Sequence, residues 1–281
     1  GNGTRLLPST FSLSKHLLNL YDKPMIYYSL SILMLGGIRE ILVISTPRDI
    51  KLFSDLLGNG ERFGVSISYA IQENPKGIAE ALIIGESFLN GSPVALVLGD
   101  NLLHGNELVS GLLNADKNQK GATIFAYRVN DPRRYGIVEF DKNGTVIGIE
   151  EKPQEPKSSY AVIGLYYYDK SVIEKVKKIK FSDRGELEIT FLNQLYLSEN
   201  NLKVEKLGRG IAWFDTGTVD SLYEASGYIR TLQHRQGLMV GSPEEIAWRN
   251  GWISEKELLD IAEKFKKSGY GEYLQKLPLN N

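Results

Sequence analysis

The feature that most constrains the fold is a regular alternation of short apolar runs with helical patterns in the first half of the chain. Four runs rich in β-branched residues have the length and composition of buried strands, and they span residues 41–45, 65–71, 94–98 and 123–129. One helical pattern precedes the first run, at residues 24–37, and two lie between the first three runs, at residues 48–60 and 78–91. Strands that alternate with helices predict an α/β fold in which crossover connections join the strands of a sheet.

The middle of the chain changes to a β-rich pattern. Residues 135–153 alternate apolar and polar side chains around Asn143-Gly144, which is a strong signal for a β-hairpin. Residues 160–169 add another strand, and helical patterns dominate the chain beyond Thr218. We therefore expect a β-rich annex on the α/β core, followed by a helical C-terminal segment.

Composition excludes several classes of function. The chain has 281 residues, 42% hydrophobic residues and a formal net charge of −1, which gives no sign of nucleic acid or an anionic membrane as a partner. It contains no cysteine, so disulfides, thiolate metal sites and a cysteine nucleophile are excluded. No apolar run reaches the roughly 18 residues that a membrane helix requires. These features suit a cytoplasmic enzyme or small-molecule binder.

The first motif with chemical character is the stretch GNGTRLLPSTFSLSKHLL at the start of the sequence. A turn built on Gly1 and Gly3 can present backbone N–H groups to an anion, and glycine allows the positive φ that such a turn needs. Arg5 and Lys15 would add positive charge. The alternative is an ordinary loop with solvated charges, since the third glycine of a dinucleotide motif and the GK[ST] of a P-loop are both missing.

Two aspartates follow apolar runs and are candidate metal ligands. Asp100 ends VALVLGD and Asp215 lies in AWFDTGT. Ligands in open α/β sheets bind outside the carboxyl ends of strands, and Mg²⁺ usually takes one or two carboxylates together with substrate phosphates. The alternatives are a turn-forming residue for Asp100 and a helix N-cap for Asp215.

Two further segments offer charged side chains. Glu151 in IEEKP could accept hydrogen bonds from sugar hydroxyls, and the neighbouring Lys152 could pair with a phosphate. Arg184 in RGELEIT is a second candidate for a phosphate contact. The alternatives are a surface turn and an ordinary loop arginine. The histidines are scattered and no G-x-S-x-G elbow occurs, so the candidate groups favour phosphate chemistry that depends on positioning and charge neutralisation.

Taken together, these motifs resemble those of glucose-1-phosphate thymidylyltransferases. The family's motifs occur in the same order from residue 1 to about residue 275, as GNGTRLLPST, SKHLL, YDKPMIYY, LGDN, RYGIVEFD, EEKP, RGELEIT, WFDTGT and YGEYLQK. The resemblance implies an Mg²⁺-dependent enzyme that joins dTTP and α-D-glucose 1-phosphate into dTDP-glucose and pyrophosphate, as the first step toward dTDP-L-rhamnose. It also implies that a strand ahead of the printed sequence leads into the first loop.

The resemblance assigns roles on the nucleotide side of the reaction. Gly1 and Gly3 would bind the triphosphate through backbone amides, while Arg5 and Lys15 would neutralise its charge. The implied thymine-reading segment contains Gln72, Pro75 and Gly77, and the implied Mg²⁺ ligands are Asp100 and Asp215. An amide side chain suits the imide edge of thymine because it can both donate and accept hydrogen bonds.

The resemblance also assigns roles on the sugar side. Gly136, Glu151 and Val162 match positions that contact glucose, and Lys152 and Arg184 match positions that bind the sugar phosphate. A regulatory nucleotide site for feedback by dTDP-rhamnose would include Glu245 and Arg249.

The implied architecture is a Rossmann-like, mixed and mostly parallel sheet with flanking helices. Its core would span residues 1–233, with a β-rich sugar-binding region at about 132–190, and residues 234–281 would form a helical C-terminal segment with regulatory or oligomer contacts. The implied assembly is a homotetramer in the cytoplasm.

Some residues depart from the family pattern without removing a proposed catalytic group. His16 and Asn19 lie close to Lys15, Ile78 follows the base-reading glycine, and Phe191 stands where aspartate is common. Two alternatives stay open. One is the same chemistry with UTP, because Gln72 would also accept uracil, and the other is a catalytically inactive nucleotide-sugar sensor.

Overall fold

The computed structural model describes residues 3–117 and 120–280, and these residues fall into two compact units. Unit 1 contains residues 71–98 and 105–213, and unit 2 contains the described residues of 2–70, 99–104 and 214–281. Each unit is discontinuous in sequence, so the chain crosses between them several times. The predicted boundary between residues 233 and 234 is a different division, and it stays a prediction.

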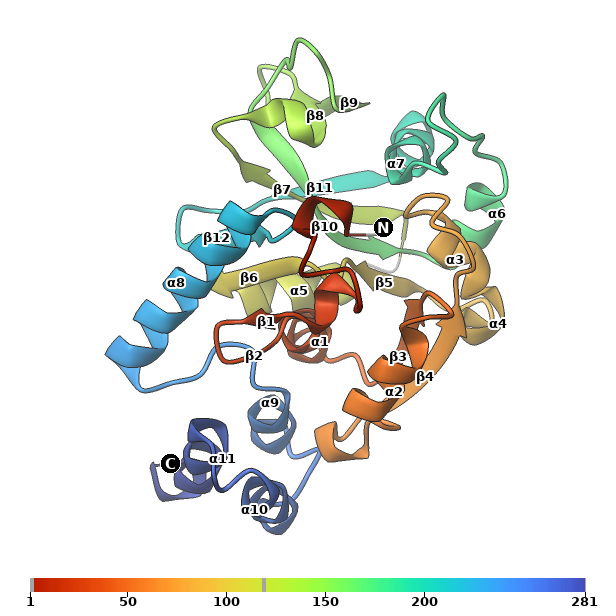
Figure 1. Ribbon diagram of the computed structural model, residues 1–281. Coiled ribbons are helices and arrows are strands. Elements are labelled where there is room, and N and C mark those ends of the chain that lie inside the picture. The colour runs from red at the N-terminus through yellow and green to blue at the C-terminus, as the bar shows by residue number, and fades with distance from the viewer. Residues whose placement is uncertain (1–2, 118–119, 281) are drawn as a thin grey trace. The chain divides into compact units, whose positions relative to one another are not determined.

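A six-stranded sheet forms the centre of unit 1 (Figure 1). Its strands are β5 (Val94–Val97), β7 (Ala122–Arg128), β8 (Gly136–Phe140), β9 (Val146–Glu151), β10 (Tyr160–Tyr168) and β11 (Leu202–Lys206). The order is β11-β7-β10-β8-β9, and β5 also pairs with β10. The predicted hairpin is confirmed, because β8 and β9 are antiparallel with Gly136 opposite Glu151.

The pairing in this sheet corrects one part of the prediction. The mixed α/β architecture is confirmed, but β10 is antiparallel to β5, β7 and β8, and only β11 runs parallel to its partner β7 among the pairings described in this sheet. The sheet is therefore not mostly parallel. Local connectivity accounts for the β8–β9 pairing, because a short link joins antiparallel strands, whereas the pairings of β10 depend on which strands meet across the sheet.

Short helices accompany the sheet of unit 1. They are α3 (Glu80–Ile84), α4 (Glu86–Leu89), α5 (Leu108–Lys117), α6 (Val172–Val176), α7 (Ile189–Ser198) and the 3₁₀ turn η4 (Pro132–Arg134). Helices α3 and α6 lie side by side, and α7 packs against β9 (Figure 1). The helical pattern predicted at 78–91 is broken at Gly85, which ends α3 and begins α4. Glycine is a poor residue for a helix interior, so a break at this position is expected from its propensity.

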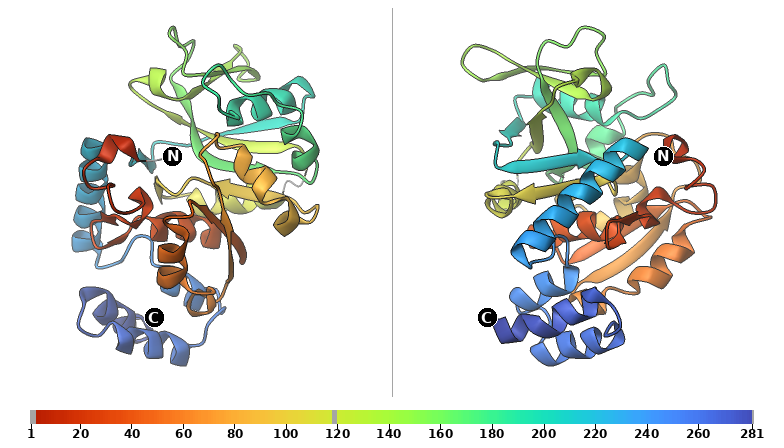
Figure 2. Two further views of the ribbon diagram at one scale, coloured as in Figure 1. Left: turned by 45° about the vertical axis from the view of Figure 1, so that its right-hand side comes forward. Right: turned by 60° about the vertical axis from the view of Figure 1, so that its left-hand side comes forward.

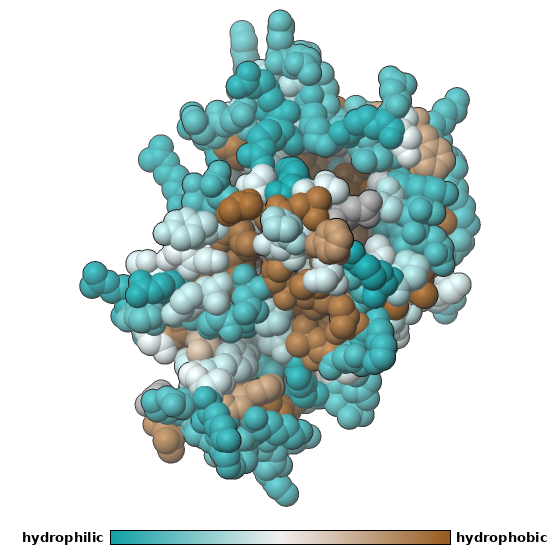
Figure 3. All heavy atoms as spheres, in the orientation of Figure 1, coloured by the Kyte–Doolittle hydropathy of each residue, from teal (hydrophilic) through white to brown (hydrophobic). Residues whose placement is uncertain are grey.

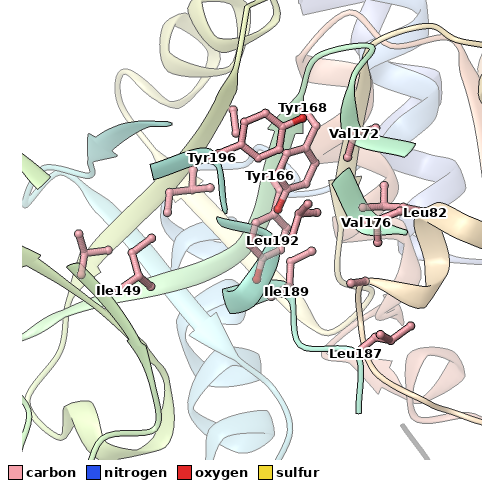
Figure 4. Close-up of a cluster of buried hydrophobic side chains, with 14 of the residues drawn as sticks. Leu82, Ile149, Tyr166, Tyr168, Val172, Val176, Leu187, Ile189, Leu192 and Tyr196 are labelled. Atoms are coloured by element: carbon pink, nitrogen blue, oxygen red, sulfur yellow. The ribbon is translucent and has the colours of Figure 1, made fainter. Parts of the chain in front are cut away.

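The core of unit 1 is rich in tyrosine. The rings of Tyr166 and Tyr168 are stacked with their centroids 6.1 Å apart, and Tyr196 of α7 stacks on Tyr168 at 5.6 Å (Figure 4). Tyr168 donates a 2.7 Å hydrogen bond to Asn193 Oδ1, which satisfies its buried hydroxyl group. Leu192, on the same helix, is completely buried in this cluster. The cluster fixes α7 on the sheet, and α7 begins next to the motif RGELEIT.

Unit 2 combines small sheets with longer helices. The first half of the unit contains η1 (Thr4–Leu6), η2 (Lys15–Leu17), β1 (Asn19–Leu20), β2 (Lys23–Pro24), α1 (Ile26–Leu35), β3 (Glu40–Ser45), α2 (Ile50–Leu57), η3 (Glu61–Phe63) and β4 (Ser66–Ile71). Strand β1 pairs with β2, and β3 pairs with β4. Strands β6 (Asn101–Gly105) and β12 (Ile211–Asp215) have residues in both units.

The predicted helical C-terminal segment is confirmed. It consists of α8 (Val219–Gln236), α9 (Pro243–Arg249), α10 (Glu255–Lys264), α11 (Gly269–Lys276) and η5 (Leu277–Asn280). Helix α8 begins with a capping box in which Thr218 and Ser221 satisfy each other's backbone N–H groups. Helices α9, α10 and α11 form one group in unit 2, drawn in dark blue in Figure 2, and α9 packs against α1.

Polar groups are buried where this group meets the rest of unit 2. Glu244 of α9 is fully buried, and burial raises the pKa of its carboxyl group above the usual value. Tyr270 donates a 2.5 Å hydrogen bond to Glu244 Oε2, and Arg62 Nε lies 3.8 Å from Oε1. These contacts from α11 and η3 partly offset the cost of burying the carboxyl group.

The surface agrees with the near-neutral composition. Hydrophilic side chains cover the visible face of the β8–β9 hairpin at the top of Figure 3. In the part of the chain that the structure describes, no helix has both the length and the apolar character required to cross a membrane.

The tyrosine-rich core generates a stability prediction. Leu192→Ala should lower the free energy of unfolding by about 2–5 kcal/mol, because it removes buried methyl groups and leaves a cavity beside α7. Urea denaturation would measure the change. Ile147→Ala is the control, since Ile147 lies in the same unit and is 55% exposed. Equal losses in the two variants would contradict the packing described above.

Candidate active site

The structure brings the two predicted metal ligands together in unit 2. Asp215 is the last residue of β12, and the next residue, Thr216, donates two hydrogen bonds to the backbone carbonyl of Asp100. The Thr216 amide lies 3.0 Å from this oxygen and the Thr216 hydroxyl 2.8 Å from it. Asp100 and Thr216 are 9% and 0% exposed, so both bonds are shielded from water. Two segments more than a hundred residues apart are thus joined by hydrogen bonds to the backbone of Asp100, next to Asp215.

Arg5 extends this cluster with a positive charge. A Cβ atom built on Gly217 would lie 2.9 Å from an Arg5 guanidinium nitrogen and 3.0 Å from Asp215 Oδ1. The guanidinium and the carboxylate therefore approach the same point of the backbone, and the absence of a side chain at Gly217 leaves room for both. A threonine of this motif, Thr218, caps helix α8, and Asp215 does not act as the cap.

Lys15 pairs directly with Asp100. The Lys15 ammonium group forms an ion pair with Asp100 Oδ2, and both side chains are 12% exposed. Asn101 Nδ2 donates to the other carboxylate oxygen at 3.2 Å. Burial alone would raise the pKa of Asp100, but the positive charge of Lys15 and its hydrogen bond outweigh burial and lower this pKa to about 2. Asp100 is therefore an anion at neutral pH.

His16 packs closely on the backbone beside this pair. A Cβ atom at Gly99 would lie 2.8 Å from His16 Cδ2, so the ring occupies the space above Gly99. His16 Nδ1 shares a 3.1 Å hydrogen bond with the Ser14 hydroxyl. Burial and the nearby Lys15 charge lower the pKa of His16 to about 4, although Asp100 acts in the opposite direction. The imidazole is neutral at pH 7, so it packs on Gly99 without adding charge.

The glycine loop at the start of the chain has the predicted type of backbone. Gly3 has φ +63°, and its carbonyl accepts a 2.8 Å hydrogen bond from the Thr10 hydroxyl. This left-handed conformation is the one for which glycine is favoured. Gly1 was predicted to share the role of Gly3, but it lies outside the described residues.

The carboxylates of unit 2 have donor chemistry that fits a hard divalent cation. Asp100 and Asp215 offer oxygen ligands, and Mg²⁺ is usually held by one or two carboxylates plus phosphates and water. Among the described residues, no group of three or more histidine, cysteine, aspartate or glutamate side chains has the arrangement of a metal site. The pair therefore suits a metal that arrives together with a phosphate ligand rather than a site closed by protein groups.

The predicted sugar-side residues converge in unit 1. Gly136 and Glu151 are opposite each other in the β8–β9 hairpin. A Cβ atom at Gly136 would lie 3.3 Å from Glu151 Oε2, 3.9 Å from Val162 Cγ2 and 3.2 Å from Thr190 Oγ1. The three predicted residues thus share one location, where Thr190 joins them. Thr190 donates a 2.5 Å hydrogen bond to Glu151 Oε2 and orients its carboxylate.

Two cations flank Glu151. Lys152 Nζ lies 3.5 Å from Glu151 Oε1, and an Arg184 guanidinium nitrogen lies 3.4 Å from the same oxygen. Arg184 also donates a 2.7 Å hydrogen bond to Glu188 Oε1. The two cationic side chains are 47% and 44% exposed, so they remain accessible to an anion.

The predicted base-reading loop is tied to the motif RGELEIT by backbone hydrogen bonds. Leu187 N–H donates to Lys76 O at 2.7 Å, and Ala79 N–H donates to Leu187 O at 3.2 Å. Gly77 has φ +106°, and a Cβ atom there would lie 2.3 Å from Leu187 O. Only glycine fits this contact, so Gly77 is required for the close approach of the two segments. Pro75 lies in the same loop and is exposed.

The predicted regulatory pair lies on one face of α9. Arg249 Nε donates a 2.8 Å hydrogen bond to Glu245 Oε1, and Tyr273 of α11 donates a 2.6 Å hydrogen bond to Glu245 Oε2. The two residues are neighbours as predicted, and their regulatory role stays a prediction.

Sequence reasoning missed the side chains that orient the charged groups. They are Thr216 beside Asp100, Thr190 and Glu188 beside Glu151 and Arg184, and Glu80 beside Gln72. Three of them lie inside the motifs DTGT and GELEIT that had already been singled out. Sequence adjacency indicates Thr216, which follows Asp215, whereas Thr190 and Glu80 meet their partners only in the folded chain.

Comparisons with known proteins show the family to which the chain belongs. Residues 1–231 match the family model described as nucleotidyl transferase. Glucose-1-phosphate thymidylyltransferases from Neisseria meningitidis serogroup A and Mycobacterium tuberculosis are each 53% identical over 277 residues, covering 99% of this chain and 96% of theirs. A solved structure from Bacillus anthracis, named for glucose-1-phosphate thymidylyltransferase and in complex with sucrose, is 36% identical with a TM-score of 0.78, covering 87% of this chain and 96% of that one. A UDP-glucose pyrophosphorylase complexed with UDP-glucose, 24% identical with a TM-score of 0.72, covers 83% of this chain and 96% of that one and shares the fold.

The half-buried imidazole of His16 generates a prediction about pH. The pKa of His16 is about 4 in the folded chain and 6.5 in an ordinary environment, so the unfolded chain binds more protons between these values. Stability should therefore fall as the pH is lowered from 6.5, and at pH 4 the loss from this group reaches about 3 kcal/mol.

Urea denaturation across pH 4–7 would measure this loss. His16→Gln should remove it, and His234→Gln, at an exposed position of α8, should keep the wild-type profile. A His16→Gln profile that is parallel to the wild-type profile would contradict the assignment of a neutral, half-buried ring.

Proposed function

Because the chain belongs to the nucleotidyl transferase family and, within it, to the glucose-1-phosphate thymidylyltransferases, we propose that it transfers a thymidylyl group from dTTP to α-D-glucose 1-phosphate. The products are dTDP-glucose and pyrophosphate. The observation that carries the proposal is the cluster in unit 2, where Asp100 and Asp215 lie together with Lys15 and Arg5 beside a glycine loop. This set of groups suits the reacting phosphates of a nucleoside triphosphate.

The reaction is a direct in-line displacement. An oxygen of the glucose 1-phosphate attacks the α-phosphorus of dTTP, the new P–O bond forms, and pyrophosphate leaves as its own P–O bond breaks. The two substrates are anions that must approach each other. Two unit charges about 4 Å apart repel by about 4 kcal/mol at an effective dielectric constant of 20. Cationic side chains reduce this repulsion and fix the direction of attack, and no protein nucleophile is needed.

On the nucleotide side, Arg5 and Lys15 are the cations. The ion pair between Lys15 and Asp100 holds the ammonium group in place before substrate binds, so little rearrangement is needed to present it to a phosphate. Asp100 and Asp215 would hold a divalent metal, which we propose to be Mg²⁺. When bound, the metal supplies positive charge to the triphosphate and the leaving pyrophosphate. The backbone of Gly3 contributes its N–H group to the phosphates.

On the sugar side, Glu151 is the hydroxyl acceptor. Thr190 holds one of its oxygens by a 2.5 Å hydrogen bond, and Lys152 and Arg184 lie near the other. Lys152 and Arg184 are 47% and 44% exposed, so both cationic side chains are accessible to the phosphate of the sugar. Gly136 and Val162 lie beside Glu151, where we propose that they contact the glucose ring.

Several wider features belong to the proposal as well. They are entry into dTDP-L-rhamnose synthesis, feedback through Glu245 and Arg249, assembly into a homotetramer and a cytoplasmic location. The support for them is membership of the family, together with the pairing of Glu245 and Arg249 on α9.

Pyrophosphate release tests the proposed function directly. The full chain is incubated with glucose 1-phosphate and each of dTTP, UTP, dCTP and dATP, with Mg²⁺ or with EDTA. We expect release with dTTP and Mg²⁺, and loss of release with EDTA. Greater release with UTP would support a uridylyltransferase instead, and binding of nucleotide without any release would support an inactive sensor.

A substitution separates the two substrates. Lys152→Ala should raise the KM for glucose 1-phosphate about tenfold or more and change the KM for dTTP by less than about twofold, because it removes a charge proposed to contact only the sugar phosphate. Lys157→Ala is the matched control, since Lys157 is an exposed lysine that pairs with Glu139 of the same hairpin. Similar increases in both KM values would contradict this assignment.

A further inference from the structure

Gln72, the predicted base reader, is held by a side chain that the resemblance did not assign. Gln72 Nε2 donates a 2.6 Å hydrogen bond to Glu80 Oε2. The same oxygen accepts a 3.3 Å hydrogen bond from the backbone N–H of Lys76. All three residues belong to unit 1, and Gln72 and Glu80 are half-buried.

This contact fixes which end of the amide faces which way. A carboxylate oxygen accepts hydrogen bonds, so the NH₂ end of the Gln72 amide must face Glu80. The carbonyl oxygen Oε1 of Gln72 then points away from Glu80. The second N–H of Nε2 is not used by Glu80 and can donate to another acceptor. Rotation of the amide by 180° would place two oxygens against each other and is unfavourable. Glu80 therefore gives Gln72 a single orientation.

Glu80 is itself held at a defined position. It is the first residue of α3, and the preceding residue, Ala79, is completely buried. The Ala79 N–H donates to Leu187 O, which fixes the start of the helix against the neighbouring segment. The hydrogen bond from the Lys76 N–H holds the Oε2 atom of Glu80 in place as an acceptor. The acceptor is thus placed by the fold and does not depend on a mobile side chain alone.

We propose that Glu80 is a positioning residue that sets the orientation of the Gln72 amide and thereby makes this loop select a pyrimidine with an imide edge, thymine or uracil, over cytosine. The inference rests on the proposed function, because it takes Gln72 as the group that reads the base.

The hydrogen-bonding groups of the bases explain the selection. Thymine and uracil present an N3–H donor between two carbonyl acceptors, so N3–H can donate to Gln72 Oε1 while the remaining N–H of Nε2 donates to a carbonyl. Cytosine presents an acceptor at N3 and a donor at N4, the reverse order. A freely rotating amide could serve both patterns. An amide with one orientation would meet cytosine acceptor to acceptor, and a buried polar group without a partner is costly.

The test compares kcat/KM for dTTP and dCTP in the pyrophosphate-release assay with glucose 1-phosphate. Glu80→Leu removes the acceptor, and the ratio of dTTP to dCTP should fall about tenfold. Glu80→Gln should keep the ratio within about threefold, because the Lys76 N–H retains an oxygen of the new amide beside Gln72 Nε2. Glu73→Leu, an exposed glutamate of the same loop, is the matched control and should behave as wild type. Glu80→Ala replaces the leucine variant if thermal denaturation shows that the latter does not fold.

A double-mutant cycle separates positioning from a general structural role. In a Gln72→Ala background, Glu80→Leu should leave the ratio of dTTP to dCTP unchanged, because no amide remains to be oriented. The inference is overturned if Glu80→Leu does not change the ratio in the wild-type background, if it changes the ratio equally without Gln72, or if Glu80→Gln loses as much as Glu80→Leu. Wild-type protein that releases no pyrophosphate with any nucleotide would instead refute the proposed function.

Discussion

The hydrogen bonds from Thr216 to the backbone carbonyl of Asp100 are the constraint on which the charged cluster of unit 2 depends. They place the end of β12 beside the residue that precedes β6, so Asp100 and Asp215 belong to one cluster of charged residues. Lys15 pairs with Asp100, and the Arg5 guanidinium group lies near the backbone beside Asp215. Thr216 has no reactive group, but its hydrogen bonds help to position the charged residues of this cluster. Those charged residues determine which chemistry the site can perform.

In unit 1, strand pairing and helix packing position the charged residues. In the β8–β9 hairpin, cross-strand pairing sets Gly136 opposite Glu151, and the helix that carries Thr190 packs against β9. The tyrosine-rich core below α7 holds that helix, so the orientation of Glu151 depends on packing between aromatic rings some distance from it. Local pairing supplies the position of the carboxylate, and tertiary packing supplies the hydrogen bond that orients it.

The difference between local pairing and tertiary contacts explains how much of the fold and of the site could be predicted from the sequence. The strands at 41–45 and 94–98, the hairpin around Asn143-Gly144 and the C-terminal helices follow from local patterns, and the structure confirms them. The antiparallel surroundings of β10 depend on which strands meet across the sheet, which periodicity does not encode. The candidate charged residues were found because their motifs are distinctive. Thr190 and Glu80 were missed because their roles arise from side chains that meet only in the folded chain.

The close contact between Gly77 and Leu187 has a consequence for how this scaffold can diversify. Two backbone hydrogen bonds span the contact, and a side chain at Gly77 has no space, so insertions and most substitutions at this junction would disturb both segments at once. Neighbouring positions whose side chains lie outside the junction are under no such restriction. Descendants of this protein that acquire a new base preference should therefore do so by exchanging side chains on a loop of constant length, and their backbone at the junction should remain superimposable on this one.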